Sequence, residues 1–395
     1  MAGFRLLVLL GILVVPYLLR AAEIRVAPAD YVVLNPTNVD KGFADFVIHT
    51  ICIASGEKET LTLQGVKVEV LSGGQVVLMR NIQPIELIEG TINLAHAPFA
   101  EYVTGQLLNP DGLNGLFGRH VVFADSAVLR PSTALAAMRI HFSVNFPVDA
   151  VRVSAAMTDL EKHGVTVTRL VPIHAFTPQI SYSSPLAGTW LMQAVPGVSS
   201  HHRFNPSTEF AQDFFRIDQD GHVAHGDPLK AENFYGYGAP VLAAAAGTVV
   251  VSVADQHQDR AALVRKPTEA MDHFLARVDD FHMKTMAGNF RAANAGNLIT
   301  IRHEQNGATE YTSYGHLRSG SVKVRVGDKV QQGQVIAAVG DTGDSAEVHL
   351  HFQVNAGADA FTSKSLPAIF ANLFDVDNNT ELGRLVSTTK SLADF

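Results

Sequence analysis

The strongest constraint on the fold is an alternation of apolar and polar residues with a period of two, which recurs along the chain between glycine turns. Val66–Val70 alternates strictly, and Ser72–Gly74 then turns the chain into Gln75–Leu78. Alternating side chains point to opposite faces of a strand, so one face is buried and the other is solvated. The pattern predicts a mainly β protein in which these two segments form a hairpin.

The first half of the chain repeats this alternation without a sustained helical stripe. Met138–Val144, Val151–Val153 and Val165–Thr168 follow the same rule. We expect an immunoglobulin-like β-sandwich over residues 23–180. This half shows no cluster of titratable residues at ligand spacing, so we interpret it as an accessory domain that packs, docks or presents substrate, and through which a protein partner could bind.

A domain boundary is expected between Thr177 and Gly188, where turn-forming residues gather. The second unit, residues 185–375, again has short strands and glycine turns, and residues 376–395 are expected to form a C-terminal tail. One stretch differs, because apolar residues there fall on one face of a helix: Met271, Phe274, Leu275, Val278 and Phe281. This predicts a helical insertion at about 256–293, either as ordinary packing surface or as a lid beside a site.

The N-terminus has the layout of an export signal, since Arg5 precedes the apolar run Leu6–Leu19. Residues 1–22 are interpreted as a signal peptide, or as an N-terminal anchor if the segment is not cleaved. The protein is therefore expected in the periplasm or cell envelope, or outside the cell, with no membrane span beyond such an anchor. Cys52 is the only cysteine, which excludes an intrachain disulfide. A net charge of -8 without a Lys/Arg cluster argues against binding to nucleic acid.

The densest candidate site contains His349 and His351, which are separated by one residue in an apolar run. On a strand the two side chains would share a face and could approach one metal ion. Upstream lie His201 and His202 in a pair, followed by Asp213 among apolar residues.

An unpaired carboxylate at the position of Asp213 would be costly to bury, and a divalent cation would keep it ionised. Two histidines and one aspartate with an open position form the ligand set of a catalytic zinc site. An ion pair of Asp213 with Arg203 or Arg216 is the alternative. His316 is a further candidate acid or base. The other histidines of this half are expected at the surface or in packing: His222, His225, His257, His273, His282 and His303.

In their order, several motifs of the second half resemble the lysostaphin-type (LytM-like) zinc metallopeptidases, which are peptidoglycan endopeptidases. They are Gly238–Ala243, Gly296–His303, Tyr314–Leu317, Val326–Val330, Gly340–Gly343 and His349–Phe352. The resemblance implies a compact antiparallel β domain with the duplicated hybrid motif fold and its site in a groove.

The resemblance also implies one zinc ion per chain, bound by His202, Asp213 and His351. His316 and His349 would be the catalytic residues beside the metal, with the choice of base between them left open. The implied reaction is hydrolysis of peptide bonds in peptidoglycan. The alternative is an inactive relative that binds or activates another cell-wall hydrolase.

Three departures from the family pattern stand out. The spacing from His202 to Asp213 is longer than the usual His-x-x-x-Asp, which leaves His201 as the alternative ligand. Glu347–Val348 replaces the usual Gly-Pro, and Gln353 stands where an acidic residue is common. These changes touch the groove wall, so we expect a different substrate preference. The cleaved bond, the role of the insertion and the oligomeric state do not follow from the sequence.

Overall fold

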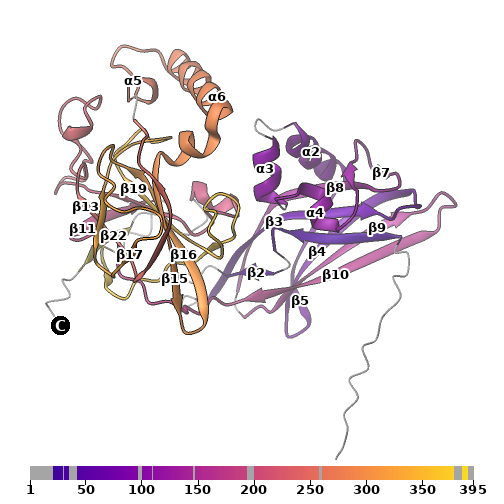
Figure 1. The fold of residues 1–395 in the computed structure, drawn as a ribbon. Helices are drawn as coiled ribbons and strands as arrows, with labels where there is room; N and C mark the ends of the chain where they lie inside the picture. Colours follow the sequence, from indigo (N-terminus) through magenta and orange to yellow (C-terminus); the bar gives the residue numbers. More distant parts are fainter. Residues whose placement is uncertain are drawn as a thin grey trace, which may run out of the picture.

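The chain forms two halves that lie side by side in the computed structural model (Figure 1). The residues that the structure describes are 21–29, 31–34, 42–96, 100–108, 110–145, 147–193, 200–257, 260–377 and 385–389. Most of the predicted signal or anchor, residues 1–22, thus lies outside the described residues. Within the described part, no helix has the length and apolar character needed to span a membrane.

The N-terminal half consists of two β-sheets with a shared core. One sheet has the strand order β1-β3-β8-β6, and the other has the order β2-β10-β9-β4-β5 with β7 paired to β4. Apolar residues of both sheets, such as Ile51 and Val153, belong to one buried cluster. The predicted hairpin is confirmed as the antiparallel pair β4–β5. The strands are β1 (Ala22–Ala27), β2 (Val32–Val33), β3 (Phe43–Ser55), β4 (Leu61–Ser72), β5 (Gln75–Ile82), β6 (Val122–Phe123), β7 (Val128–Leu129), β8 (Thr133–Asn145), β9 (Ala150–Thr158) and β10 (Gly164–His174).

The sequence of this half shows no sustained helical stripe, but the structure contains helices there. Between β5 and β6 the chain forms α2 (Pro84–Ala95), α3 (Ala100–Leu107) and α4 (Gly112–Phe117). Helix α2 starts with Pro84 in its first turn and a capping box between Gln83 and Glu86, and it buries Leu87 and Leu94 on one face. These start signals are present in the sequence, but the strands on both sides of them obscured the helical period.

The C-terminal half is built on one long antiparallel sheet, as the prediction of a mainly β catalytic domain required. The strand order is β17-β14-β15-β16-β19-β12-β11-β22-β21, with β20 paired to β19 and a separate pair β13–β18. Strand β22 lies within the segment predicted as a C-terminal tail and pairs with β11. The strands are β11 (Thr189–Gln193), β12 (Gln212–Phe215), β13 (Pro240–Leu242), β14 (Gly247–Val253), β15 (Asn297–Gln305), β16 (Ala308–Leu317), β17 (Lys329–Val330), β18 (Val335–Ala338), β19 (Leu350–Asn355), β20 (Ser365–Leu366), β21 (Leu373–Asp377) and β22 (Leu385–Thr389).

The predicted helical insertion is present between β14 and β15 as α5 (Arg260–Leu263) and α6 (Met271–Ala295). Helix α6 lies along the upper edge of the C-terminal half in Figure 1. Its apolar stripe is packed only in part, because Met271 and Leu275 are exposed whereas Phe274, Val278 and Phe281 are half-buried. Arg277 connects the two helices by donating to the backbone carbonyls of Ala261 and Ala262 in α5 and to the carboxylate of Glu269.

Candidate metal centre and active site

Three neighbouring strands at the middle of the long sheet bring the candidate residues together. Asp213 on β12 lies directly opposite His351 on β19, and Gly315 on β16 lies opposite His351 from the other side. Because the strands are antiparallel and in register, residues far apart in sequence meet on one face. His316 is the penultimate residue of β16, and His349 immediately precedes β19.

The carboxylate of Asp213 lies between two imidazoles. Its Oδ2 atom is 3.0 Å from Nε2 of His202, and its Oδ1 atom is 3.0 Å from Nδ1 of His351. Nε2 of His349 is 3.7 Å from the same Oδ1 atom. The structure therefore brings together all three predicted ligands and one of the two predicted catalytic histidines around a single carboxylate.

Asp213 is ionised although it is only 4% exposed. Burial alone would raise the pKa of this carboxyl, but the hydrogen bonds from His202 and His351 hold it well below its usual range. Burial lowers the pKa of His202 to about 4, so this imidazole is neutral at physiological pH. An ionised carboxylate beside a neutral imidazole is the protonation state in which both groups can bind a cation.

His202 is closer to this carboxylate than its neighbour His201 is. Nε2 of His201 is 3.7 Å from Oδ2 of Asp213, and the His201 side chain is 72% exposed against 12% for His202. Both residues lie in the short 3-10 helix η1 (His201–Phe204), whose cap Ser200 accepts a hydrogen bond from the His202 amide. Ligand atoms of His201, His202 and Asp213 lie within 4.8 Å of one another.

The alternative partners of Asp213 are excluded. Arg203 pairs with Asp45 and Glu209 instead, and the guanidinium of Arg216 lies over the ring of Trp190. The buried aspartate is therefore held by histidines.

The two candidate acid–base histidines are fixed by backbone carbonyls. Nδ1 of His316 donates to the carbonyl oxygen of Thr342 at 2.8 Å, and Nδ1 of His349 donates to that of Glu347 at 2.8 Å. The two rings lie 4.6 Å apart between centroids. Since each Nδ1 lies against a carbonyl, the Nε2 atom of each ring is the nitrogen that faces away from that contact and is placed to exchange a proton with a bound group.

His316 shows two further marks of a functional residue. Its φ of 56° lies in the left-handed region, which non-glycine residues rarely adopt and which is frequent at functional sites. Burial and the nearby His349 and His351 lower its pKa well below the usual value, so the ring is neutral.

Two further residues support the histidines: Phe215, which the sequence did not indicate, and Gln353, which was expected at the groove wall but contacts His351 instead. The ring of Phe215 stacks on His349 with centroids 4.9 Å apart. The side-chain oxygen of Gln353 lies 2.7 Å from Nε2 of His351, while the Gln353 amide nitrogen donates to Ser207, Asn355 and Ala360. Because the nitrogen faces three acceptors, the oxygen must face His351, so His351 donates from Nε2 and its Nδ1 atom faces Asp213.

A second group of ligand type lies at the surface. Asp218, Asp220 and His222 offer ligand atoms within 4.8 Å of one another, but Asp220 and His222 are exposed. His303, in contrast, is buried and bonded to the carbonyl of Ala246 and the hydroxyl of Thr312, which fits the packing role expected for it.

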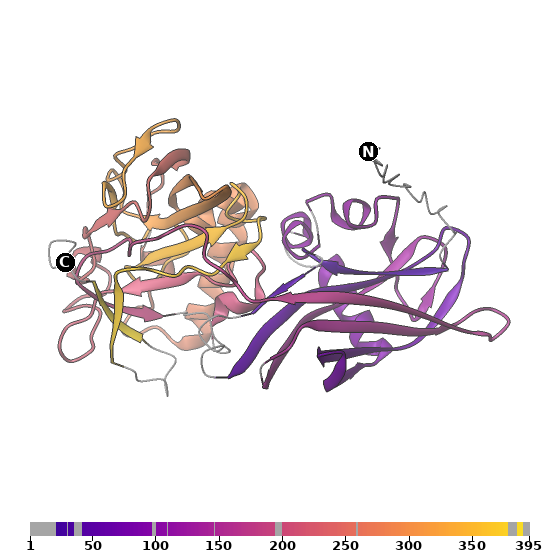
Figure 2. The same ribbon diagram turned by 90° about the horizontal axis from the view of Figure 1, so that it is seen from below.

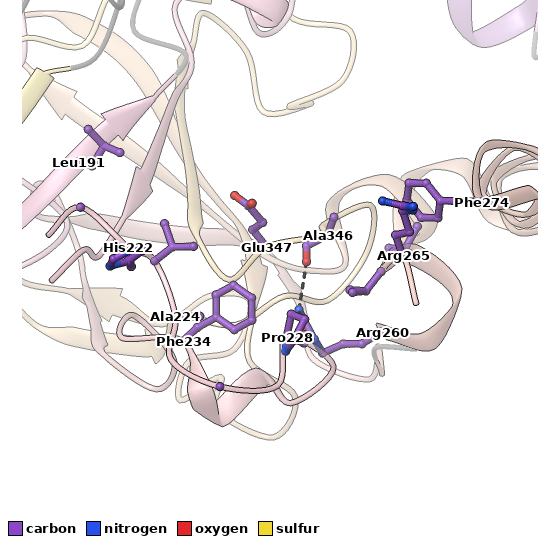
Figure 3. Close-up of a pocket in the computed structure, with 15 residues that line it drawn as sticks. Leu191, His222, Ala224, Pro228, Phe234, Arg260, Arg265, Phe274, Ala346 and Glu347 are labelled. Carbon is purple, nitrogen blue, oxygen red and sulfur yellow. Dashed lines mark hydrogen bonds between the residues drawn. The ribbon is translucent and has the colours of Figure 1, made fainter. Parts of the chain in front are cut away.

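A pocket of about 600 Å³ adjoins the candidate site. Its wall includes Ala346 and Glu347, and the Glu347 carbonyl holds His349. The helical insertion supplies another part of the wall, and Arg260 donates from it to the Ala346 carbonyl at 3.1 Å, which is the dashed line in Figure 3. Apolar lining residues are Leu191, Val223, Phe234, Leu263, Val264 and Phe274.

Comparison with known proteins finds a family match within the C-terminal half of the chain. Residues 232–363 match the family model for Peptidase family M23. His316, His349 and His351 lie inside this match, whereas His202 and Asp213 precede it. No curated protein matches the chain.

Three solved structures are similar to parts of this chain. The catalytic domain of lysostaphin from Staphylococcus simulans is 20% identical, with 47% of this chain and 85% of that chain covered and a TM-score of 0.23. A variant of the catalytic domain of the prophage-encoded M23 protein EnpA from Enterococcus faecalis is 15% identical over 49% and 91%, with a TM-score of 0.24. A zinc-containing peptidase from Vibrio cholerae is 14% identical over 83% and 82%, with a TM-score of 0.25.

Proposed function

Because residues 232–363 form a domain of peptidase family M23, we propose that the protein is a zinc metalloendopeptidase that hydrolyses peptide bonds in peptidoglycan. The observation that carries the proposal is the approach of His202 Nε2 and His351 Nδ1 to the two carboxylate oxygens of Asp213. The N-terminal sequence supports export, and we propose that the protein acts in the periplasm or cell envelope, or outside the cell.

The donor set fits zinc. Two imidazole nitrogens and one carboxylate match the ligands of catalytic zinc sites, which keep a further position open. The hydrogen bond between His351 and Gln353 also fits zinc binding, because Gln353 accepts from Nε2 of His351 and thereby leaves Nδ1 for the metal. His202, Asp213 and His351 would hold one zinc ion per chain.

Zinc, when bound, supplies a Lewis acid that polarises a carbonyl and makes water a stronger acid. The remaining chemistry falls to the two fixed histidines. The neutral ring of His316 can accept a proton at Nε2, while His349, held by the carbonyl of the pocket residue Glu347, can hold a proton toward the reacting group. The carbonyls of Thr342 and Glu347 prevent either ring from turning away.

The adjoining pocket suits an extended peptide. Its apolar lining would receive a side chain of the substrate. Because Glu347 lines the pocket and its carbonyl holds His349, that side chain would lie near the reacting bond. The helical insertion forms part of the wall, so the insertion would contribute to the choice of substrate.

The test is zinc content and muropeptide release from purified cell walls, measured for the wild type and Asp213→Ala. Asp218→Ala is the matched control, since it removes an aspartate from the second group of ligand type. We expect about one zinc per chain and released peptides in the wild type and the control, and neither in Asp213→Ala.

Two results would count against this proposal. Loss of zinc in Asp218→Ala with zinc retained in Asp213→Ala would move the metal to the surface group. A metal-free and inactive wild type would instead favour the alternative, a relative that binds or activates another cell-wall hydrolase.

A further inference from the structure

Arg203, the residue after the ligand His202, is buried at the junction of the two halves. Its side chain is 0% exposed, and it donates to Glu209 at 2.6 Å and to Asp45 at 3.1 Å. Glu209 belongs to the C-terminal half, but Asp45 lies on β3 of the N-terminal half. The guanidinium next to a metal ligand is therefore held by a carboxylate from the other half of the chain.

Titratable groups of both halves surround this contact. Nε2 of His141, on β8, is 2.6 Å from the same Oδ1 atom of Asp45. Nε2 of His49, on β3, and Nζ of Lys364 are 3.6 Å and 3.8 Å from Oε2 of Glu209. Two cations, Arg203 and Lys364, thus face two carboxylates, and each of these four side chains is at most 10% exposed.

Such a cluster holds its members firmly, because removal of one charge leaves another buried without compensation. Arg203 and His202 are consecutive residues of the single-turn helix η1, so anchoring of the Arg203 side chain restrains the backbone that carries the His202 imidazole. Without Asp45, Arg203 would keep only Glu209 as a charged partner and lose its link to the N-terminal half.

A second chain of hydrogen bonds runs from the N-terminal half to the other histidine ligand. Gln106 of α3 donates from its side-chain nitrogen to Ser207 Oγ at 3.1 Å and to the Phe361 carbonyl at 2.8 Å. The Ser207 carbonyl accepts from Gln353, whose oxygen accepts from His351. Figure 2 shows the two halves side by side, with long strands of the N-terminal half running toward the C-terminal half.

We propose that Asp45 and Gln106 of the N-terminal half are positioning residues for the metal centre, acting on His202 through Arg203 and on His351 through Ser207 and Gln353. This rests on the proposed zinc site. It changes the role expected for the N-terminal half from an accessory to a part of the catalytic scaffold. Outer partners of metal ligands typically affect metal affinity by about 10- to 100-fold, which sets the expected effect.

The test measures zinc affinity by competition with a chromophoric chelator, using the full chain. Asp45→Asn keeps the shape of the side chain but removes its charge, and Gln106→Ala removes the second connection. We expect each to weaken zinc binding by about tenfold or more, to alter the absorption bands of the cobalt-substituted protein, and to lower kcat more than it changes KM. Asp45→Asn and Arg203→Gln should be non-additive in a double-mutant cycle.

The matched control is Ile48→Ala, which removes buried apolar volume from the same strand, β3, without touching Arg203. It should lower the unfolding temperature but leave the zinc affinity and the cobalt spectrum unchanged. If Asp45→Asn fails to fold, Gln106→Ala carries the test. Wild-type zinc affinity and cobalt spectrum in every folded variant would overturn the inference while leaving the proposed function intact. A wild type that binds no zinc would overturn both.

Discussion

Gly296 packs directly against Thr342, so closely that a Cβ atom at position 296 would overlap the Thr342 carbonyl group. That carbonyl is the group that accepts the Nδ1 proton of His316. Gly296 also has a φ of 62°, which residues other than glycine adopt only at a cost in free energy. The orientation of His316 in β16 therefore depends on the absence of a side chain at position 296, directly before β15.

The first prediction is that Gly296→Ala disturbs the site. The clash must displace Thr342, so we expect a lower unfolding temperature and at least a tenfold loss of turnover, measured by thermal unfolding and muropeptide release. Gly288→Ala is the control, because a Cβ atom there meets nothing within 4 Å and its φ is ordinary. Alanine in a helix stabilises by about 0.5–1 kcal/mol relative to glycine, so this variant should be as stable as the wild type or slightly more so. Equal activity of both variants would remove the link between Gly296 and His316.

The second prediction separates catalysis from metal binding. In His316→Ala the proton acceptor is lost while His202, Asp213 and His351 remain, so turnover should fall by about 10²- to 10⁴-fold with zinc content unchanged. His303→Ala is the control, since it removes another buried histidine, which hydrogen-bonds to Ala246 and Thr312 and not to the predicted ligands. It should lose stability and keep turnover. Loss of zinc in His316→Ala would make His316 a ligand.

The sequence predicted the part of the fold that depends on local pattern. Strict alternation at Val66–Val70 identified the β4–β5 hairpin, because side-chain direction in a strand follows residue by residue. The same local reading overlooked α2, whose capping box and Pro84 were visible but stood between strands. Alternation along one strand does not determine which strands become neighbours, so the opposition of Asp213 and His351 required the sheet itself.

For the candidate site, the residue types were predictable and their supports were not. His202, Asp213, His316, His349 and His351 were identified from spacing and from family resemblance, and all lie at one place in the structure. The junction with the N-terminal half could not be foreseen, because Asp45 and Arg203 are far apart in sequence and neither stands in a motif. Buried ion pairs of this kind depend on packing between distant segments, which has no periodic signature.

The third prediction concerns the pocket beside His349. Val264 is half-buried and lines this pocket from the insertion, so Val264→Trp should fill part of the space that a substrate side chain would occupy. We expect KM to rise several-fold with kcat nearly unchanged, because the change removes binding that ground state and transition state share. Leu275→Trp is the control, as Leu275 is exposed on α6 and does not line the pocket. Unchanged kinetics in Val264→Trp would show that substrate does not enter.

The fourth prediction uses the buried pair of Arg260 and Asp341, whose Nη1 and Oδ2 atoms are 2.6 Å apart. Burial raises the pKa of Asp341 even though Arg260 opposes the shift. In Arg260→Met that opposition is gone, so the folded-state pKa rises further above the unfolded value of about 3.9. At neutral pH the variant should be destabilised by about 3–5 kcal/mol, since a buried carboxylate is left without its cation.

The sign of the pH dependence follows from proton binding. Below about pH 4 both the folded and the unfolded variant hold the Asp341 proton, so the deficit relative to wild type is smallest there. As pH rises, the unfolded chain releases the proton first, and the deficit should grow until the folded-state pKa is passed. Urea unfolding of the metal-free protein between pH 4 and pH 8 measures this. The double variant Arg260→Met/Asp341→Asn should lose less free energy of unfolding than Arg260→Met, and this loss should not depend on pH. If Arg260→Met loses the same free energy of unfolding at pH 4 and at pH 7, the account is contradicted.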